Sequence, residues 1–97
     1  MLFRSQLRRY LDATYQRYHK PIWLTEYALI RFGATPTYPT PAQQADFIRA
    51  STAMLEHLTY LERYAWFALP TGTSGDGTGL YRTGNTPTTA GAAYRAA

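Results

Sequence analysis

Two short strand-forming segments, separated by a stretch long enough for a helix, constrain the fold of this chain most. Residues 21–28 and 62–69 are rich in aromatic and β-branched or other apolar residues. Strands that are largely apolar on both faces are typical of parallel sheets covered by helices. Because parallel strands need a crossover connection, usually a helix, the pattern predicts an α/β fold.

Three segments carry helical signals, at about residues 2–18, 41–60 and 88–96. The irregular, threonine- and proline-rich residues 31–40 and the glycine-rich loop 71–79 should connect the elements. In the first helix, apolar and aromatic side chains recur at three- and four-residue steps and should form its buried face. They are Leu7, Tyr10, Leu11, Thr14 and Tyr18.

The second helix has the clearest start signal. Thr40 can cap it, Pro41 suits its first position, and Gln43 completes a capping-box pattern. The side chains at helical spacing that should be buried are Ala45, Ile48, Thr52, Leu55 and Leu58.

Charge is concentrated at the start of the chain. The first twenty residues carry five basic side chains and one acid, while the remaining chain balances five against five. A basic interaction module working through Arg4, Arg8, Arg9 and Arg17 is therefore one alternative function, although such clusters are usually a solvated helix face. Nucleic acid is not an expected partner.

Several site types are not expected from composition. The chain has no cysteine, and His19 and His57 lie far apart without ligand spacing, so neither a metal site nor a cofactor is predicted. No segment has the length of a membrane span, and no signal peptide is recognised at the first residues, so the location of the chain stays open.

Glu26 is an acid within an otherwise apolar strand. It lies either solvated or paired at the strand end, or in a functional position at the carboxyl end of a parallel strand, where barrel enzymes place their chemistry. By simple alternation, Ile22 and Leu24 share its side. Trp66 has the same two interpretations, plain core or a ring beside Glu26 on which the flat face of a sugar stacks.

The spaced motifs WLTEYA (23–28), ERYAWF (62–67) and GAAY (91–94) resemble the end of the Asl1-like glycosyl hydrolases, glycoside hydrolase family 128. The resemblance implies that residues 1–97 are a partial (β/α)₈-barrel (TIM-barrel) domain, its C-terminal part, with strands seven and eight and flanking helices. It implies a retaining β-1,3-glucanase whose nucleophile is Glu26. Trp66, Tyr27 and Tyr64 are the expected substrate-binding residues, and β-glucan is the expected partner.

The same resemblance sets limits on activity. A complete barrel needs about 250 residues, and the family's acid/base glutamate, in an Asn-Glu-Pro context, has no counterpart here. Retaining hydrolysis needs two carboxyl groups, and of the other acids only Asp76 could approach Glu26. We therefore expect a piece of a longer enzyme that is inactive alone, so whether this chain is itself an enzyme stays open.

Three further expectations follow. The alternative to an enzyme segment is a noncatalytic carbohydrate-binding remnant that uses Trp66, Tyr27 and Tyr64 as stacking platforms. Exposed sheet edges should favour self-association. The parent enzyme is expected to be secreted or associated with a cell wall.

Overall fold

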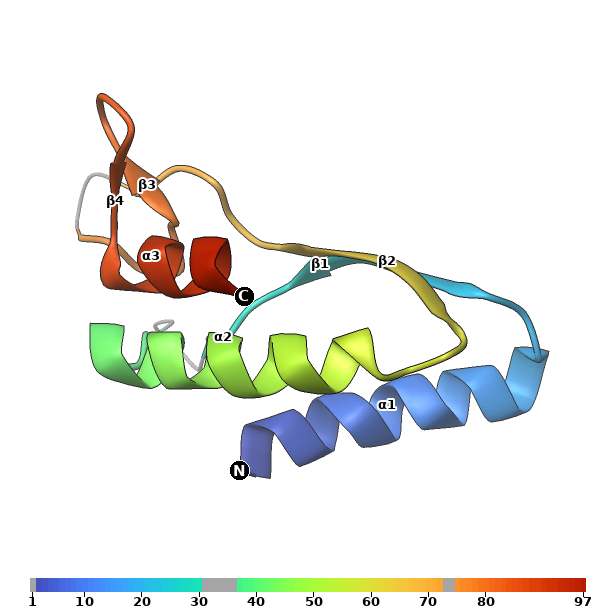
Figure 1. Ribbon diagram of the computed structural model, residues 1–97. Helices are drawn as coiled ribbons and strands as arrows, with labels where there is room; N and C mark the ends of the chain where they lie inside the picture. Colours follow the sequence, from blue (N-terminus) through green and yellow to red (C-terminus); the bar gives the residue numbers. More distant parts are fainter. Residues whose placement is uncertain (1, 31–36, 73–74) are drawn as a thin grey trace.

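The computed structural model describes residues 2–30, 37–72 and 75–97. A two-stranded parallel sheet and a small antiparallel pair of strands are combined with three helices in this part of the chain (Figure 1). In chain order, the elements are α1 (Leu2–Tyr18), β1 (Ile22–Tyr27), α2 (Pro41–Glu56), β2 (Leu61–Trp66), β3 (Tyr81–Arg82), β4 (Thr86–Pro87) and α3 (Thr89–Ala96). The predicted parallel strands and three helices are confirmed.

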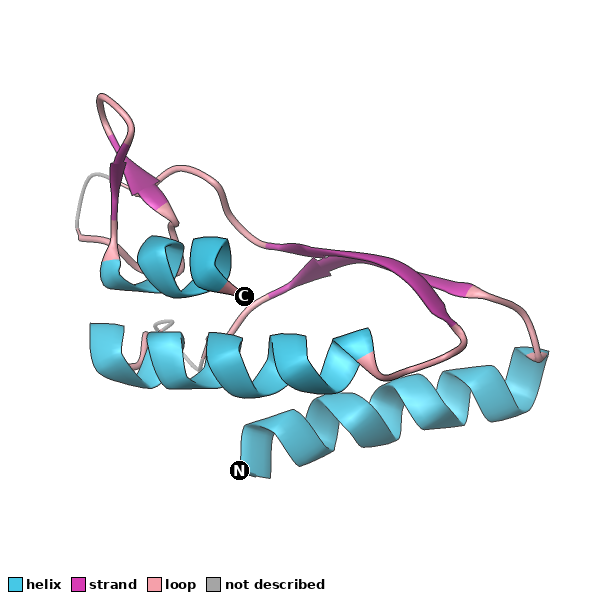
Figure 2. Ribbon diagram, viewed as in Figure 1, coloured by secondary structure: helices cyan, strands magenta, loops and turns pink. Residues whose placement is uncertain are grey.

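The elements form two layers. Helices α1 and α2 run beneath the β1–β2 sheet, and α3 lies over the first half of α2 (Figures 1 and 2). Among the described elements, none covers the other face of the sheet (Figure 2). The described part of the chain is therefore packed on one side of the sheet only.

The core lies between the sheet and α2. All five α2-side residues predicted to be buried are at most 7% exposed. Thr40 accepts a hydrogen bond from the Gln43 amide, and the Gln43 side chain accepts one from the Thr40 amide, so the predicted capping box is present.

The buried face of α1 differs from the prediction. Tyr10 and Tyr18 are 65% and 61% exposed, whereas Leu11 is buried and Leu7 packs against the core. The ring of Tyr15 stacks on Tyr60 at 4.6 Å between centroids. The face therefore follows the four-residue step 7, 11, 15, and the tyrosines that flank this stripe extend into solvent.

One helix and one strand end earlier than predicted. Helix α2 ends at Glu56 because the amides of His57 and Leu58 bond to carbonyls three residues back, which tightens the last turn. Strand β2 ends at Trp66 because the Leu69 carbonyl accepts from the amides of Leu80 and Tyr81 instead of continuing the ladder with β1.

The segment before α3 contains a hairpin, β3–β4, that the sequence did not predict. Gly84 and Asn85 at its turn both have positive φ, a conformation that these residue types adopt readily. The expected irregular connection and the glycine-rich loop lie partly outside the described residues, at 31–36 and 73–74.

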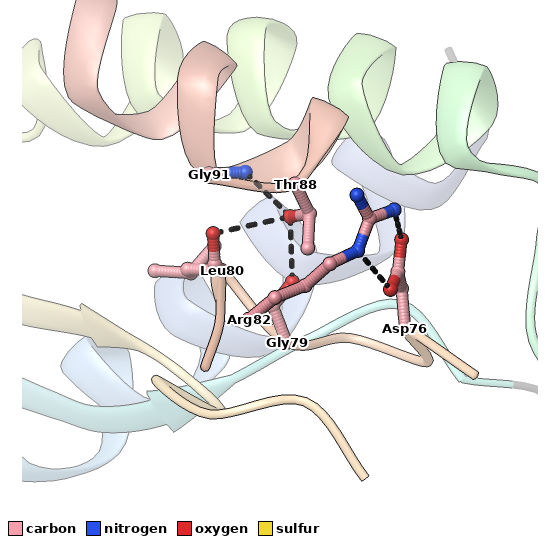
Figure 3. Close-up of polar contacts among 6 residues, drawn as sticks. All are labelled: Asp76, Gly79, Leu80, Arg82, Thr88 and Gly91. Atoms are coloured by element: carbon pink, nitrogen blue, oxygen red, sulfur yellow. Dashed lines mark hydrogen bonds and ion pairs between the residues drawn. The ribbon is translucent and has the colours of Figure 1, made fainter. Parts of the chain in front are cut away.

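A close contact fixes α3 at its first turn (Figure 3). Thr88 caps the helix: its hydroxyl accepts from the Gly91 amide and donates to the Gly79 carbonyl at 2.7 Å. A Cβ on Gly91 would lie 1.9 Å from the Leu80 carbonyl oxygen, so only glycine fits there without movement of the backbone. This contact holds the chain after β2 against the helix layer.

Candidate functional site

Glu26 lies at the carboxyl end of β1, with its side chain exposed. Its neighbour Tyr27 is buried under the sheet at 7% exposure. Because successive side chains of a strand point to opposite faces, Glu26 extends from the sheet face that the helices leave uncovered. In parallel α/β sheets, ligands bind at the carboxyl ends of the strands.

Glu26 differs from every other acid of the chain. Within residues 2–30, 37–72 and 75–97, no side chain bonds to its carboxylate, whereas each of the other five acids has a partner. Those pairs are Asp12 with Arg8 and Tyr60, Asp46 with Arg49, Glu56 with Tyr64, Glu62 with Trp23, and Asp76 with Arg82.

Asp76 is held away from a catalytic role by its own ion pair. Arg82 Nε and Nη2 donate to the two Asp76 oxygens at 3.0 and 2.6 Å (Figure 3). These bonds from Arg82 lower the pKa of the Asp76 carboxyl. A carboxylate engaged in this way is a poor proton donor at neutral pH.

The prediction of which β1 residues share the sheet face of Glu26 was wrong. Ile22 and Leu24 do not share its face, because both pack against the core on the helix side. The pairing of β1 with β2 is irregular between Leu24 and Tyr27, where one extra residue breaks the alternation. Leu24 and Tyr27 therefore face the helices together.

Trp66 does not lie beside Glu26. It is 7% exposed, and its ring packs on Tyr27 and Phe47 beneath the sheet. Its Nε1 donates to the Thr78 carbonyl at 2.7 Å. In this structure the Trp66 ring is therefore part of the core, enclosed by α2 and by the loop that contains Thr78.

The two tyrosines of the predicted site also face the helices. Tyr27 and Ser51 share a hydrogen bond of 3.1 Å between their hydroxyls, and the Tyr64 hydroxyl donates to Glu56 at 2.5 Å. Burial raises the pKa of Tyr27 to about 12. Burial and the Glu56 carboxylate raise the pKa of Tyr64. Both side chains thus tie the sheet to α2 as neutral hydroxyls.

Two accessible aromatic residues on or next to the sheet were not among the predicted site residues. Trp23 is 59% exposed on the uncovered face of the sheet, and Phe67, directly after Trp66, is 48% exposed. The Trp23 Nε1 donates to Glu62 at 2.8 Å, and the Arg63 guanidinium lies 5.4 Å from its ring centroid. Trp23 could have been identified from strand alternation, because it precedes Leu24 and so points to the opposite face of the sheet.

Cavity size does not identify the site. A hollow of about 930 Å³ lies between α1, the end of β1 and α2, but Glu26 is not among its lining residues. A shallower hollow of about 490 Å³ lies on the uncovered face of the sheet. It is lined by Trp23, Leu24, Thr25, Glu62, Arg63, Tyr64 and Ala65.

The basic side chains of α1 are brought together only in part. Arg4, Arg8 and Arg9 line a hollow of about 590 Å³ with His57, while the Arg17 guanidinium lies over the Tyr18 ring. The Asp12 carboxylate pairs with Arg8.

The described residues hold no group of three or more potential metal ligands. None of the described helices is long and apolar enough to span a membrane.

A family model described as the glycosyl hydrolase catalytic core matches residues 3–94. Among curated proteins, no match is found.

Solved structures of family 128 glucanases match the fold. The chain is 60% identical to a subgroup I endo-β-1,3-glucanase from Amycolatopsis mediterranei in complex with laminarihexaose, with a TM-score of 0.87. A subgroup II endo-β-1,3-glucanase from Sorangium cellulosum is 27% identical, with a TM-score of 0.75. A subgroup V exo-β-1,3-glucanase from Cryptococcus neoformans is 20% identical, with a TM-score of 0.79, and supports the fold alone.

These matches cover most of this chain but a minor part of each relative. The respective shares are 97%, 92% and 94% of this chain, against 38%, 32% and 38% of the relatives. The chain thus spans about two fifths or less of the length of these enzymes. The resemblance to family 128 is confirmed, with the α/β fold matching part of its catalytic domain.

Proposed function

Because this chain belongs to the glycosyl hydrolase catalytic core family, we propose that it supplies part of the active site of a retaining β-1,3-glucanase, with Glu26 as the nucleophile. The observation that carries the proposal is that Glu26 is exposed at the carboxyl end of a parallel strand and unbonded within the described residues. A carboxylate that attacks an anomeric carbon must be accessible and not engaged elsewhere.

β-1,3-Glucan is the proposed substrate. The Amycolatopsis enzyme has been solved with laminarihexaose and, as a second variant, with laminaritriose and laminaribiose. In these two structures, different glutamates are replaced. A pair of glutamates fits a retaining mechanism, in which one carboxyl attacks the sugar and the other protonates the leaving oxygen at a separation of about 5–5.5 Å.

The second carboxyl of the pair is proposed to come from outside this chain. The other five acids are each bonded to a partner, and Asp76 is bound at both oxygens by Arg82. By itself the chain should then bind glucan weakly and hydrolyse none. Residues 1–97 would contribute strands seven and eight of the complete barrel.

Trp66, Tyr27 and Tyr64 are proposed to act as positioning residues. They fix the ends of β1 and β2 on α2 and so hold Glu26 in place. Phe67 follows Trp66 in sequence. Because the Phe67 ring is exposed and the Trp66 ring is buried, Phe67 is better placed than Trp66 for contact with sugar. A purely carbohydrate-binding role through Trp66, Tyr27 and Tyr64 is disfavoured, because two of these rings are buried and the third is partly buried.

A graft tests the proposal. Residues 1–97 replace the matching part of the Amycolatopsis enzyme, and release of reducing sugar from laminarin is measured. We expect the graft to be active and its Glu26→Gln variant to lose activity by several orders of magnitude, with glucan binding retained. The matched control is Asp46→Asn, on an exposed acid of α2. A Glu26→Gln graft as active as this control would refute the role of Glu26.

A further inference from the structure

We propose that a basic groove between α1 and α2 binds an anionic polysaccharide through the carboxylate groups of the polymer. The basic groove is a hollow of about 590 Å³ in the helix layer. One wall comes from α1, with Arg4, Arg8 and Arg9, and the other from the α2 side, with Ala50, Ala53, Met54 and His57. Only the class of polymer rests on the proposed function, because the groove does not include Glu26.

The arginines give the groove an unbalanced positive charge. The net charge of the chain is +4, and its first twenty residues carry five basic side chains against one acid. No acidic side chain lines the groove. Within the described residues, Arg8 pairs with Asp12 at 3.4 Å, whereas Arg4 and Arg9 have no ion-pair partner. Like charges four residues apart, such as Arg4 and Arg8, weaken a helix. These charges therefore favour a bound anion.

The α2 side of the groove is a low, apolar floor with one further polar group. Ala50, Ala53 and Met54 recur at three- and four-residue steps and leave space above the helix. His57 follows α2, and its Nδ1 lies 2.9 Å from the Ala53 carbonyl oxygen. Because a carbonyl oxygen only accepts, Nδ1 carries the proton of this bond. The Nε2 atom is then the ring nitrogen left for a ligand in the groove.

The groove fits a polymer better than a small molecule. None of its lining side chains is buried, whereas small-molecule sites enclose about 70–90% of the ligand surface. No aromatic ring lines it, although nucleobases and neutral sugars are commonly held by stacking on such rings. Recognition is then left to charge, and a guanidinium group pairs with a carboxylate through two parallel hydrogen bonds.

A carboxylate-bearing polysaccharide is the occupant that suits the proposed substrate, which is itself a polysaccharide. The basic groove and Glu26 lie on different sides of the sheet: α1 and α2 run beneath it, and Glu26 extends from the uncovered face (Figure 1). Both sites can therefore be occupied at once. Binding in the groove would keep the enzyme on a material in which glucan and an acidic polysaccharide occur together.

Surface plasmon resonance on immobilised polygalacturonate tests the groove with the 97-residue chain. We expect saturable binding that weakens as the salt concentration rises. Arg4→Gln/Arg9→Gln should bind about 10-fold more weakly, because it removes two exposed charges from the groove. The control Arg17→Gln/Lys20→Gln removes the same charge from exposed positions outside the groove and should weaken binding less than about twofold. Circular dichroism verifies that both variants are folded.

The same pairs of substitutions in the graft repeat the comparison in a complete barrel. Loss of polygalacturonate binding by Arg4→Gln/Arg9→Gln, with unchanged hydrolysis of laminarin, supports a separate site. Absence of binding, or equal weakening by the two double variants, overturns the groove. Tighter binding to single-stranded DNA than to polygalacturonate overturns the polysaccharide as its occupant. A Glu26→Gln graft that stays active refutes the proposed function, whereas the comparison on polygalacturonate decides the groove independently.

Discussion

Tyr27 connects the site to the core at a single position. Its backbone follows Glu26, its carbonyl accepts from the Phe67 amide at 2.8 Å, and its ring lies edge-on to Trp66. The buried hydroxyl is satisfied by Ser51. A buried ring next to the exposed carboxylate restricts the end of β1, which suits the catalytic role proposed for Glu26.

The raised pKa of Tyr27 predicts a loss of stability at alkaline pH. Below its ordinary value near 10, the hydroxyl is protonated in both states and its contribution is complete. Between pH 10 and about 12, the unfolded state ionises first, so rising pH favours unfolding. The pKa of Tyr60 is likewise raised to about 12, chiefly by burial, and contributes with the same sign.

Urea unfolding at a series of pH values from 8 to 12 measures this effect. The free energy of unfolding should fall over the upper half of that range, and Tyr27→Phe should make the fall shallower. Tyr10→Phe, at an exposed position, serves as the control. Equal pH profiles for the Tyr27→Phe variant and the unsubstituted chain would contradict the prediction.

At the scale of elements, the attachment of α3 depends on close backbone contact and not on large side chains. Ala90, Gly91 and Ala93 form its buried side, and Thr88 bonds both its first turn and the preceding loop (Figure 3). Small residues allow the helix to approach the Leu80 carbonyl. This approach places the chain after β2 over the start of α2 (Figure 1).

Gly91→Ala should therefore destabilise the chain. The added methyl would lie 1.9 Å from the Leu80 oxygen, so backbone must shift, at a cost of roughly 1–3 kcal/mol typical of overpacking. Gly72→Ala is the matched control, since a Cβ there meets no atom within 4 Å. Thermal unfolding followed by circular dichroism compares the two, and similar midpoints would show that α3 can move away freely.

At the scale of the whole molecule, the described part of the chain packs on one side of its sheet. The uncovered face of the sheet exposes Trp23, and Phe67 and Leu69 beyond β2 are 48% and 63% exposed. Exposed apolar side chains beside unpaired strand edges favour association.

We expect the chain alone to form larger species as its concentration rises. Sedimentation velocity at increasing concentration would detect them. A monodisperse monomer at high concentration would contradict this expectation.

The sequence by itself determined what depends on neighbours along the chain. The capping box at Thr40 and the buried stripe of α2 were predictable, because helix signals repeat at fixed local spacing. The parallel pairing followed from the helical connection between two strands. The cost of burying an acid in an apolar strand singled out Glu26, and its exposed position at the strand end agrees with the solvated interpretation.

Only the tertiary structure decided which side of the sheet each residue faces. The irregularity in the pairing between Leu24 and Tyr27 reverses the alternation, so Glu26 leaves the face of Leu24 and lies with Trp23 on the uncovered face of the sheet. Trp66 packs between the sheet and α2. Such a bulge is set by the fit of two strands over shared helices, which no local pattern encodes. The identity of the residues fixed the chemistry available, and packing against α2 decided which of them a sugar can reach.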